Sequence, residues 1–358
     1  MRQDLDQHII DAWSNLETRA LTANPYSSPD FVLPALEHLT PASNVIFLLV
    51  ESGRLHAPRL HALGVFEQQG PSTAFPLRSL SSYFSLHTFL GGMMVDNEAP
   101  GQALAAFFDF LAKHSEDWHA VKFTHRPADG TFSAMRDVTA ADTGLQWHEL
   151  ETFDRPILRP NLAGEEFLRT KLRSRNKDCQ RLLRQLAATG KKVEWRFLRG
   201  DQIKDANIVR FLELENMGWK RARGTSLVSH QSENRFFIEM MTRFRRRGQV
   251  FMTELCLDGQ AIASTTNLIS RGIGFAFKIG WDNQYAHYAP GILNEVEFIR
   301  NAPQVCPDLE YIDGGTLPGT FIDKLWLDRR KLATGMYPTT TLGEKALTAM
   351  KVIRRLTR

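Results

Sequence analysis

The segment from Lys278 to Ile292 holds residue types that can bind an anion and move a proton. Lys278 stands in an apolar strand pattern over 273–280, where a charge must find a partner or point into a cleft. Ala289-Pro290-Gly291-Ile292 then opens a helical pattern, and the N–H groups and dipole of a helix start attract anions. This spacing predicts an anion-binding turn. The alternative is an ordinary turn, with the lysine reaching solvent from a sheet edge.

Two acidic residues follow or end strand patterns. Asp282 comes just after the strand that carries Lys278, where α/β proteins gather polar groups, so it is a candidate general base. Its alternative role is to form a turn, which Asp-Asn pairs favour. Asp313 ends a later strand pattern before two glycines, which let the chain approach a ligand closely. We therefore expect Lys278, Asp282 and Asp313 to be catalytic.

A regular series of elements must position these residues. Alternating or apolar runs predict strands, and apolar residues at helical spacing predict helices. Asp258-Gly259 is a strong hairpin signal between two of the strands. The second half of the chain then has strands at 192–198, 250–257, 261–269, 273–280 and 309–313, and helices at 201–220, 232–246, 292–300 and 320–327.

The first half repeats this order. It has predicted helices at 5–21, 29–39, 102–114 and 131–138, and strands at 45–50, 60–66, 88–95, 120–124 and 147–153. Asp-Asn precedes Ala-Pro-Gly and a helix in both halves, at Gly101 and at Gly291, 190 residues apart. Gly-Thr-Phe recurs at Phe132 and Phe321, 189 residues apart. Two landmarks at nearly one offset predict a duplication; the alternative is chance similarity of short turns.

The domain prediction follows from this repeat. We expect an N-terminal domain over 1–158, a basic helical connecting segment over 159–190, and a C-terminal domain over 191–358 that carries the active site. The connecting segment has seven Lys and Arg residues between 169 and 184. These residues form either a solvated helix face or a contact for phosphate or nucleic acid.

Composition sets broad limits. The 358 residues are 43% hydrophobic and 23% charged, with a net charge of +4, which suits two soluble domains and an anionic partner. No apolar run approaches the ~20 residues of a membrane span, and no signal peptide is recognisable, so we expect a cytoplasmic protein without membrane insertion. The three cysteines and eleven histidines lack metal-ligand spacing, so no metal is expected.

Several short sequence motifs, in this order, indicate a resemblance to a known family. They are Asn24-Pro25-Tyr26, Ser174-Arg175-Asn176-Lys177, Glu215 to Lys220, Lys278-Ile279-Gly280-Trp281-Asp282, and Asp313-Gly314-Gly315 ahead of Lys324 and Trp326. Over nearly its whole length the chain resembles the GNAT superfamily of N-acetyltransferases. It looks most like the bacterial group called cellulose-biosynthesis-type or BioF-like acetyltransferases, which is related to the Fem-type aminoacyltransferases.

The resemblance implies a fold and a reaction. The fold is α/β (α+β), with two tandem GNAT-like domains, each a mixed, mostly antiparallel sheet flanked by helices. The reaction is N-acyl transfer from acyl-CoA, as co-substrate, to a small-molecule amine by direct attack. The resemblance associates this reaction with cell-envelope or polysaccharide metabolism. The second copy would carry it, because the first copy has a shorter loop without tyrosines. The usual phosphate loop is replaced here by Tyr285 to Gly291.

The resemblance also implies residue roles. Tyr288 would join the catalytic group as the acid for the leaving thiolate, unless it only packs. The donor would contact Tyr285, Ala289, Pro290, Gly291 and Ile292, and the acceptor would contact Trp219, Lys220, Thr225 and Lys324.

Two other functions stay open at this point. One is Fem-type transfer from aminoacyl-tRNA, with the basic stretch and Lys351, Arg354, Arg355 and Arg358 on the RNA. The other is a non-catalytic scaffold built on an acyltransferase fold.

Overall fold

The protein consists of two compact units. The computed structural model describes residues 5–39, 44–54, 57–217 and 219–356, with only the backbone of 54, 57, 219–220 and 353–356. The first unit comprises Met1–Asp154 together with Arg330–Arg358, and the second is the continuous stretch Arg155–Arg329. Within the described ranges, every helix is too short or too polar to cross a bilayer.

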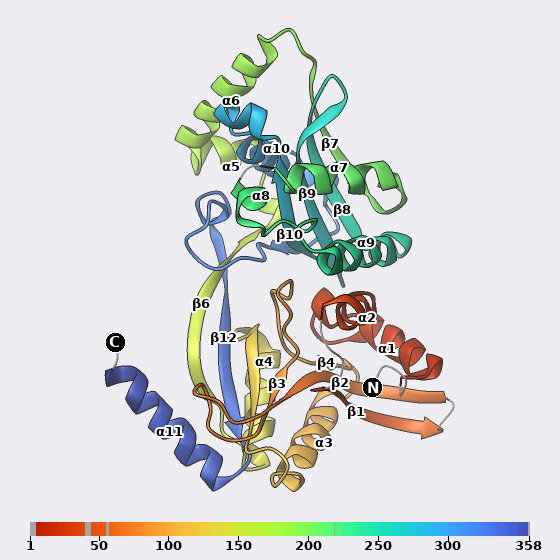
Figure 1. Ribbon diagram of the computed structural model, residues 1–358, viewed down its shortest axis with the longest axis vertical. Coiled ribbons are helices and arrows are strands. Elements are labelled where there is room, and N and C mark those ends of the chain that lie inside the picture. The colour runs from red at the N-terminus through yellow and green to blue at the C-terminus, as the bar shows by residue number, and fades with distance from the viewer. Residues whose placement is uncertain (1–4, 40–43, 55–56, 218, 357–358) are drawn as a thin grey trace. The chain divides into compact units, whose positions relative to one another are not determined.

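The first unit is a mixed sheet with helices on both faces (Figure 1). Its strand order is β1-β2-β3-β5-β12-β6, with β4 beside β2. Its strands are β1 (Val45–Arg54), β2 (Ala57–Gln69), β3 (Ser79–Ser82), β4 (Met94–Val95), β5 (Ala120–Pro127), most of β6 (His148–Leu158) and most of β12 (Asp328–Pro338). Its helices are α1 (Gln7–Arg19), α2 (Pro29–His38), α3 (Pro100–Lys113), α4 (Gly130–Asp142) and α11 (Thr341–Leu356).

Aromatic residues fill the core of the first unit. Helix α3 places Leu104, Phe107 and Leu111 at helical spacing, and all three are buried. Phe107 stacks on Phe66 of β2 with ring centroids 5.9 Å apart. Tyr337 of β12 joins the same cluster. The C-terminal strand is therefore part of this core.

The second unit has the strand order β6-β11-β10-β9-β8-β7. Its strands are the end of β6, β7 (Val193–Arg199), β8 (Val250–Leu257), β9 (Gln260–Ser270), β10 (Ile273–Trp281) and β11 (Tyr311–Asp313). Its helices are α5 (Glu165–Thr170), α6 (Arg173–Ala187), α7 (Asp205–Glu215), α8 (Trp219–Arg223), α9 (Gln231–Arg246) and α10 (Pro290–Val305), with 3₁₀ turns η6 (Asn283–Tyr288) and η7 (Ile322–Lys324).

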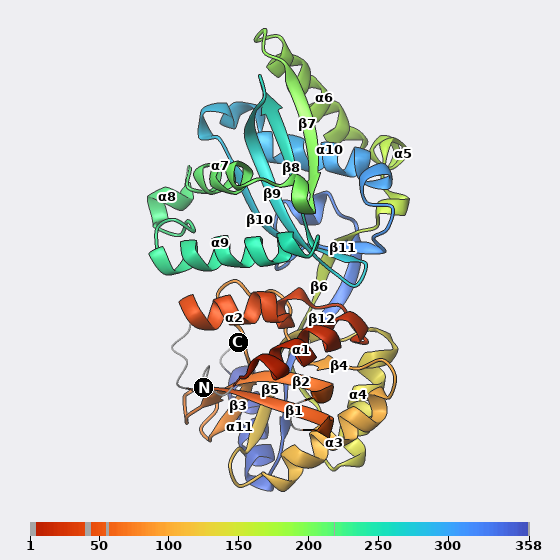
Figure 2. The same ribbon diagram turned by 90° about the vertical axis from the view of Figure 1, so that its right-hand side faces the viewer.

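Helices cover both faces of this sheet (Figure 2). Helices α5, α6 and α10 share one core with residues of the strands. On the other face, Phe237 of α9 stacks on Phe211 of α7 and on Phe277 of β10. All eight residues of β8 are buried, as expected for a strand covered on both sides. The tandem α/β arrangement expected from the sequence is confirmed.

The structure divides the chain differently from the expected boundaries at 158 and 190. Residues 159–190 lie inside the second unit, because α5 and α6 bury Leu168, Leu172 and Leu186 in its core. The end of the chain belongs to the first unit, because β12 pairs with β5 from Leu332 to Pro338. The sequence analysis assigned no elements to 328–356, which form β12 and α11. It also placed a strand at 88–95, where only β4 forms, and missed β3.

Candidate active site

Strand β10 presents different side chains to the two helical layers. A register shift between Ala276 and Lys278 makes Phe277 an extra, bulged residue. The Phe277 ring lies parallel to that of Phe237 in α9, with centroids 6.2 Å apart. Ile279 instead lies beside Gly291 of α10. The bulge therefore places Lys278 between Phe277, which packs on α9, and Ile279, which packs on α10.

A pocket of about 280 Å³ lies at the start of α10. Its lining residues are uncharged: Ile279, Trp281, Ala286, Ala289, Pro290, Gly291, Ile292 and Phe321. Gly291 allows a close approach in this wall, because a Cβ there would lie 3.2 Å from Trp281 Cδ1 and 3.3 Å from Ile279 Cδ1, and these side chains would have to shift. The four residues Ala289–Ile292, expected to bind the donor, all line this pocket.

The loop from Asp282 to Ala289 leads into the pocket. It ends with Ala289 in the left-handed conformation (φ 50°, ψ 53°), which is unfavourable for a residue with a Cβ. The Ala289 carbonyl accepts hydrogen bonds from the backbone N–H groups of Ile292 and Leu293. Pro290, with its fixed φ, then starts the helix. The backbone is therefore strained at the wall of the pocket.

The two tyrosines of this loop lie beside the pocket, whose wall takes Ala286 and Ala289 from the loop. The Tyr285 hydroxyl accepts a hydrogen bond from Lys191 Nζ at 3.0 Å. The Tyr288 ring lies 3.8 Å from the ring of His287, centroid to centroid. Both tyrosines pack partly buried against the core of the second unit. Their roles at the donor stay predictions.

The two candidate carboxylates lie in separate polar networks. Asp282 is 7% exposed; its Oδ1 accepts the backbone N–H of Gln284, and its Oδ2 lies 3.7 Å from Arg210 Nη2. Asp313 is fully buried; its Oδ1 accepts the N–H of Gly315 and lies 3.4 Å from Arg155 Nη1. The structure therefore places each aspartate against its own arginine.

Lys278 interacts through its charge with Glu233 of α9, which the sequence analysis did not single out. Burial raises the pKa of the Glu233 carboxyl; the charges of His230 and Lys278 oppose this rise, and Glu215 adds to it. Glu215 is 2% exposed and accepts the backbone N–H of Leu227. Glu233 precedes Phe237 by one helical turn, so the i, i+4 spacing was the signal that places it on the sheet-facing side.

The expected acceptor residues come from different segments of the second unit. Thr225 is exposed between α8 and α9, whereas Lys324 is exposed in η7, shortly after the pocket residue Phe321. Trp219 and Lys220 begin α8, and their side chains lie outside the described part of the structure.

Glu295 is a second acidic residue that the sequence analysis missed. It lies on α10 one turn after Gly291, and only 4% of its surface is exposed. Burial raises the pKa of its carboxyl to about 8. Among the described residues, its Oε2 has no hydrogen-bond partner. Its position in the apolar face of the helix, between Gly291 and Phe298, was the sequence signal.

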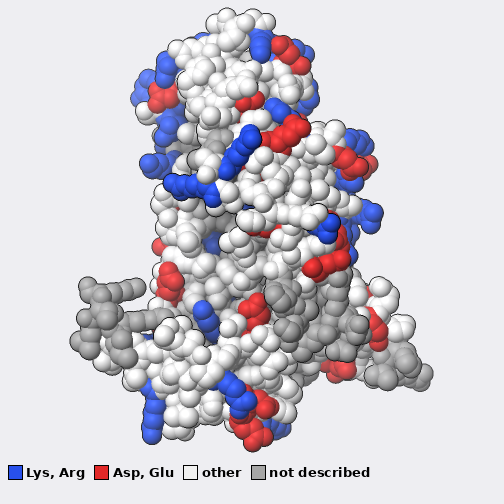
Figure 3. Space-filling model, in the orientation of Figure 1, with Lys and Arg blue, Asp and Glu red and all other residues white. Residues whose placement is uncertain are grey.

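Charge differs between the units. Residues 155–329 hold 28 Lys and Arg against 20 Asp and Glu, a net charge of +8, whereas the rest of the chain has a net charge of −4. Figure 3 shows one face of this distribution. The unit that holds the pocket is therefore the one with the net positive charge, which attracts anions.

Residues 173–316, which contain the pocket and β10, match the family model described as acetyltransferase (GNAT) domain. This match places a GNAT-type domain within the second unit. The GNAT domain begins with α6 and ends just after β11, so it includes Lys278, Asp282 and the start of α10. A comparison with curated proteins gave no match.

Solved structures show the same fold over both units. The C-terminal domain (DUF2156) of a putative lysylphosphatidylglycerol synthetase from Agrobacterium fabrum is 13% identical, with a TM-score of 0.58, over 96% of this chain and 95% of that chain. FemX is 9% identical, with a TM-score of 0.59, over 92% and 95%. L-PGS from Bacillus licheniformis is 13% identical, with a TM-score of 0.51, over 93% and 98%. The GNAT domain is thus one part of a fold that these proteins share over nearly their whole length.

Proposed function

We propose that the second unit is an N-acyltransferase that moves an acyl group from an acyl-CoA thioester to the amine of a small molecule. The observation that carries this proposal is the pocket at the start of α10, lined by Ala289–Ile292 within the GNAT domain. Its apolar wall suits the uncharged pantetheine arm and acyl group. The helix start and the net positive charge of the unit suit the donor's phosphates.

The reaction is a direct displacement. The amine nitrogen attacks the thioester carbonyl carbon, the C–N bond forms and the C–S bond breaks. The amine gives up a proton, and the leaving thiolate takes one. In this proposal Lys278 stabilises the developing negative charge, and Glu233, whose carboxyl interacts with the charge of Lys278, contacts the acceptor amine. We place the chain in the cellulose-biosynthesis-type or BioF-like group, acting in the cytoplasm on an amine of cell-envelope or polysaccharide metabolism.

Calorimetric titration with acetyl-CoA and with a long-chain acyl-CoA tests the donor. Wild-type protein is expected to bind at least one of them. Gly291→Trp is expected to abolish binding, because even a Cβ there meets Trp281 and Ile279.

The duplication provides the matched control. Gly101 holds the corresponding place at the start of α3, and a Cβ there would meet nothing within 4 Å. Gly101→Trp should bind donor as wild type does. Wild-type protein that binds neither thioester would contradict the proposal and favour the tRNA-dependent or scaffold function.

Transfer from aminoacyl-tRNA is the second candidate, and the charge of the second unit favours it. Helix α6 exposes Arg173, Lys177, Arg181 and Arg184. The tail residues expected to join them do not lie in this unit: Lys351 is on α11 of the first unit, Arg354 and Arg355 are described only as backbone, and Arg358 is outside the described residues. Binding of tRNA that weakens steeply with salt, and weakens further when the α6 cations are replaced, would support this candidate.

A further inference from the structure

An arginine of α7 joins the loop before the pocket to the neighbouring strand. Arg210 donates from Nε and Nη2 to the carbonyl oxygen of Ala261 at 3.0 and 2.9 Å, and its Nη2 lies 3.7 Å from Asp282 Oδ2. The N–H of Asp282 donates to the carbonyl of Ile262 at 2.8 Å. The Asp282 Oδ1 in turn accepts the N–H of Gln284 at 2.9 Å. We call this arrangement the clamp.

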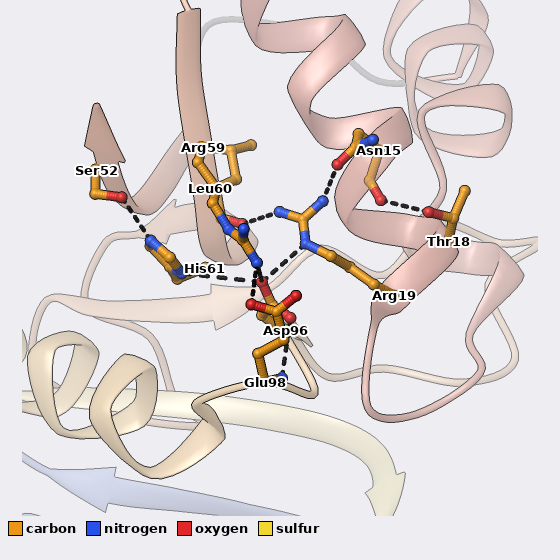
Figure 4. Close-up of polar contacts among 9 residues, drawn as sticks. All are labelled: Asn15, Thr18, Arg19, Ser52, Arg59, Leu60, His61, Asp96 and Glu98. Carbon is orange, nitrogen blue, oxygen red and sulfur yellow. Dashed lines mark hydrogen bonds and ion pairs between the residues drawn. The ribbon is translucent and has the colours of Figure 1, made fainter. Parts of the chain in front are cut away.

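The first unit contains a similar clamp, in which the aspartate also lies 3.4 Å from Arg59 Nη2 (Figure 4). Arg19, at the end of α1, donates from Nη2 to the carbonyl of Leu60 at 2.6 Å, and its Nε lies 2.8 Å from Asp96 Oδ2. The N–H of Asp96 donates to the carbonyl of His61 at 2.8 Å. The Asp96 Oδ1 accepts the N–H of Glu98 at 3.1 Å.

The two clamps hold different loops. Asp96 is three residues before Ala99, which has an extended φ of −141°, and no 3₁₀ turn intervenes. Asp282 is seven residues before Ala289, which has a φ of 50°, and η6 lies between them. A strained residue persists only where its surroundings hold it in place. In the second unit, the clamp holds the start of the loop at Asp282, and the strained Ala289 lies at the other end.

We propose that Arg210 and Asp282 are positioning residues that hold the donor loop, Asp282–Ala289, in the conformation that forms the pocket. This inference rests on the proposed function for the identity of the donor. It replaces the expectation that Asp282 is the general base. A base needs an accessible oxygen, whereas Asp282 is 7% exposed with both oxygens engaged. Its counterpart Asp96, in a unit with a short loop, likewise lies against an arginine and accepts the backbone N–H two residues on.

The first readout needs no donor. Amide hydrogen exchange over 283–289 should quicken by about tenfold or more in Asp282→Asn and in Arg210→Lys, because local opening of the loop becomes easier. Glu213→Gln is the matched control, because it removes only the exposed partner of Arg210 Nη1. Exchange in Asp282→Asn equal to that of wild type would overturn the proposal, whether or not acyl-CoA binds.

The second readout separates positioning from proton transfer. In Asp282→Asn, the Kd and KM for the donor thioester should rise about tenfold, while kcat and the acidic limb of its pH profile change little. Asp96→Asn should leave donor binding unchanged. Loss of the acidic limb, with kcat lowered by a factor of about 100 or more and donor Kd unchanged, would identify Asp282 as the base and overturn the inference.

Discussion

The first and second units enter an equivalent helix through the same tripeptide, Ala-Pro-Gly, and in the second unit that tripeptide lines a pocket. The frame around it is shared: an arginine, an aspartate and a strand carbonyl occupy the same places in both units. The difference is the longer loop, the left-handed Ala289 and the excess of Lys and Arg. We therefore expect the two copies of the frame to differ in chemistry because of this loop and the surface charge.

The largest effect is expected from the buried ion pairs, one in each unit. Arg155→Met should lower the stability of the second unit by about 3–5 kcal/mol, because it leaves the fully buried Asp313 without its arginine. Arg126→Met should cost the first unit less, about 2 kcal/mol, since its partner Asp137 is 35% exposed. Hydrogen exchange, monitored separately in each unit, measures both losses of stability. Equal losses would show that burial of the partner does not set the difference.

The pH response should distinguish the units next. Burial raises the pKa of Glu295 to about 8, while an unfolded Glu titrates near ~4.3. Between pH ~4.3 and about pH 8, the folded protein therefore holds a proton that the unfolded chain has lost. The stability of the second unit falls as pH rises through this range. Glu295→Gln should be more stable than wild type by several kcal/mol, up to about 5, at pH 8 and by little at about pH 4.5. Thermal unfolding at both pH values is the measurement.

Asp96 provides the opposite case in the first unit. Burial would raise its pKa, but the hydrogen bonds and charges of Arg19, Arg59 and the Glu98 N–H outweigh burial and lower it. Its contribution to stability is present above the unfolded pKa of about 3.9 and is lost as pH falls through the lowered value. Asp96→Asn should therefore destabilise near neutral pH and converge on wild type in acid. A stability difference independent of pH, for either variant, would contradict this assignment.

The smallest effect tests the strained turn. Ala289→Gly should stabilise the second unit by about 0.5–1 kcal/mol, because glycine adopts a positive φ without the Cβ penalty. Ala99→Gly should destabilise the first unit by about the same amount, because its φ of −141° suits alanine. Denaturant unfolding of the two variants and of the wild type measures these changes in the free energy of unfolding. A loss of stability in both variants would show that the two turns do not differ in strain.

Local patterns were enough to predict most elements and to single out Ala289–Ile292, which line the pocket. The apolar runs of β8, β9 and β10 and the Ala-Pro-Gly start of α10 are visible in the sequence because they depend on neighbouring residues only. The strand β12 was missed, since its pairing partner β5 lies about 200 residues earlier in the chain. A two-residue strand such as β4 has too little pattern to be assigned.

The partners of the candidate site residues depended on tertiary structure. The sequence placed Asp282 and Asp313 at strand ends, but it could not show that Arg210 and Arg155 each engage one of them. The burial of Glu295 and the approach of Glu233 to Lys278 likewise depend on which helix face meets the sheet. The catalytic roles of Lys278 and Tyr288, and the silence of the first unit, stay predictions.

The return of Arg330–Pro338 to the first unit has a consequence for how the chain is made. The ribosome completes Arg155–Arg329 before it adds the strand that pairs with β5. At about 5–20 residues per second, roughly 9–37 s separate the synthesis of Asp154 from that of Pro338, the end of β12. During this interval all residues of the GNAT domain are made, while β5 of the first unit still lacks β12 and leaves an open sheet edge that nascent-chain chaperones are suited to cover.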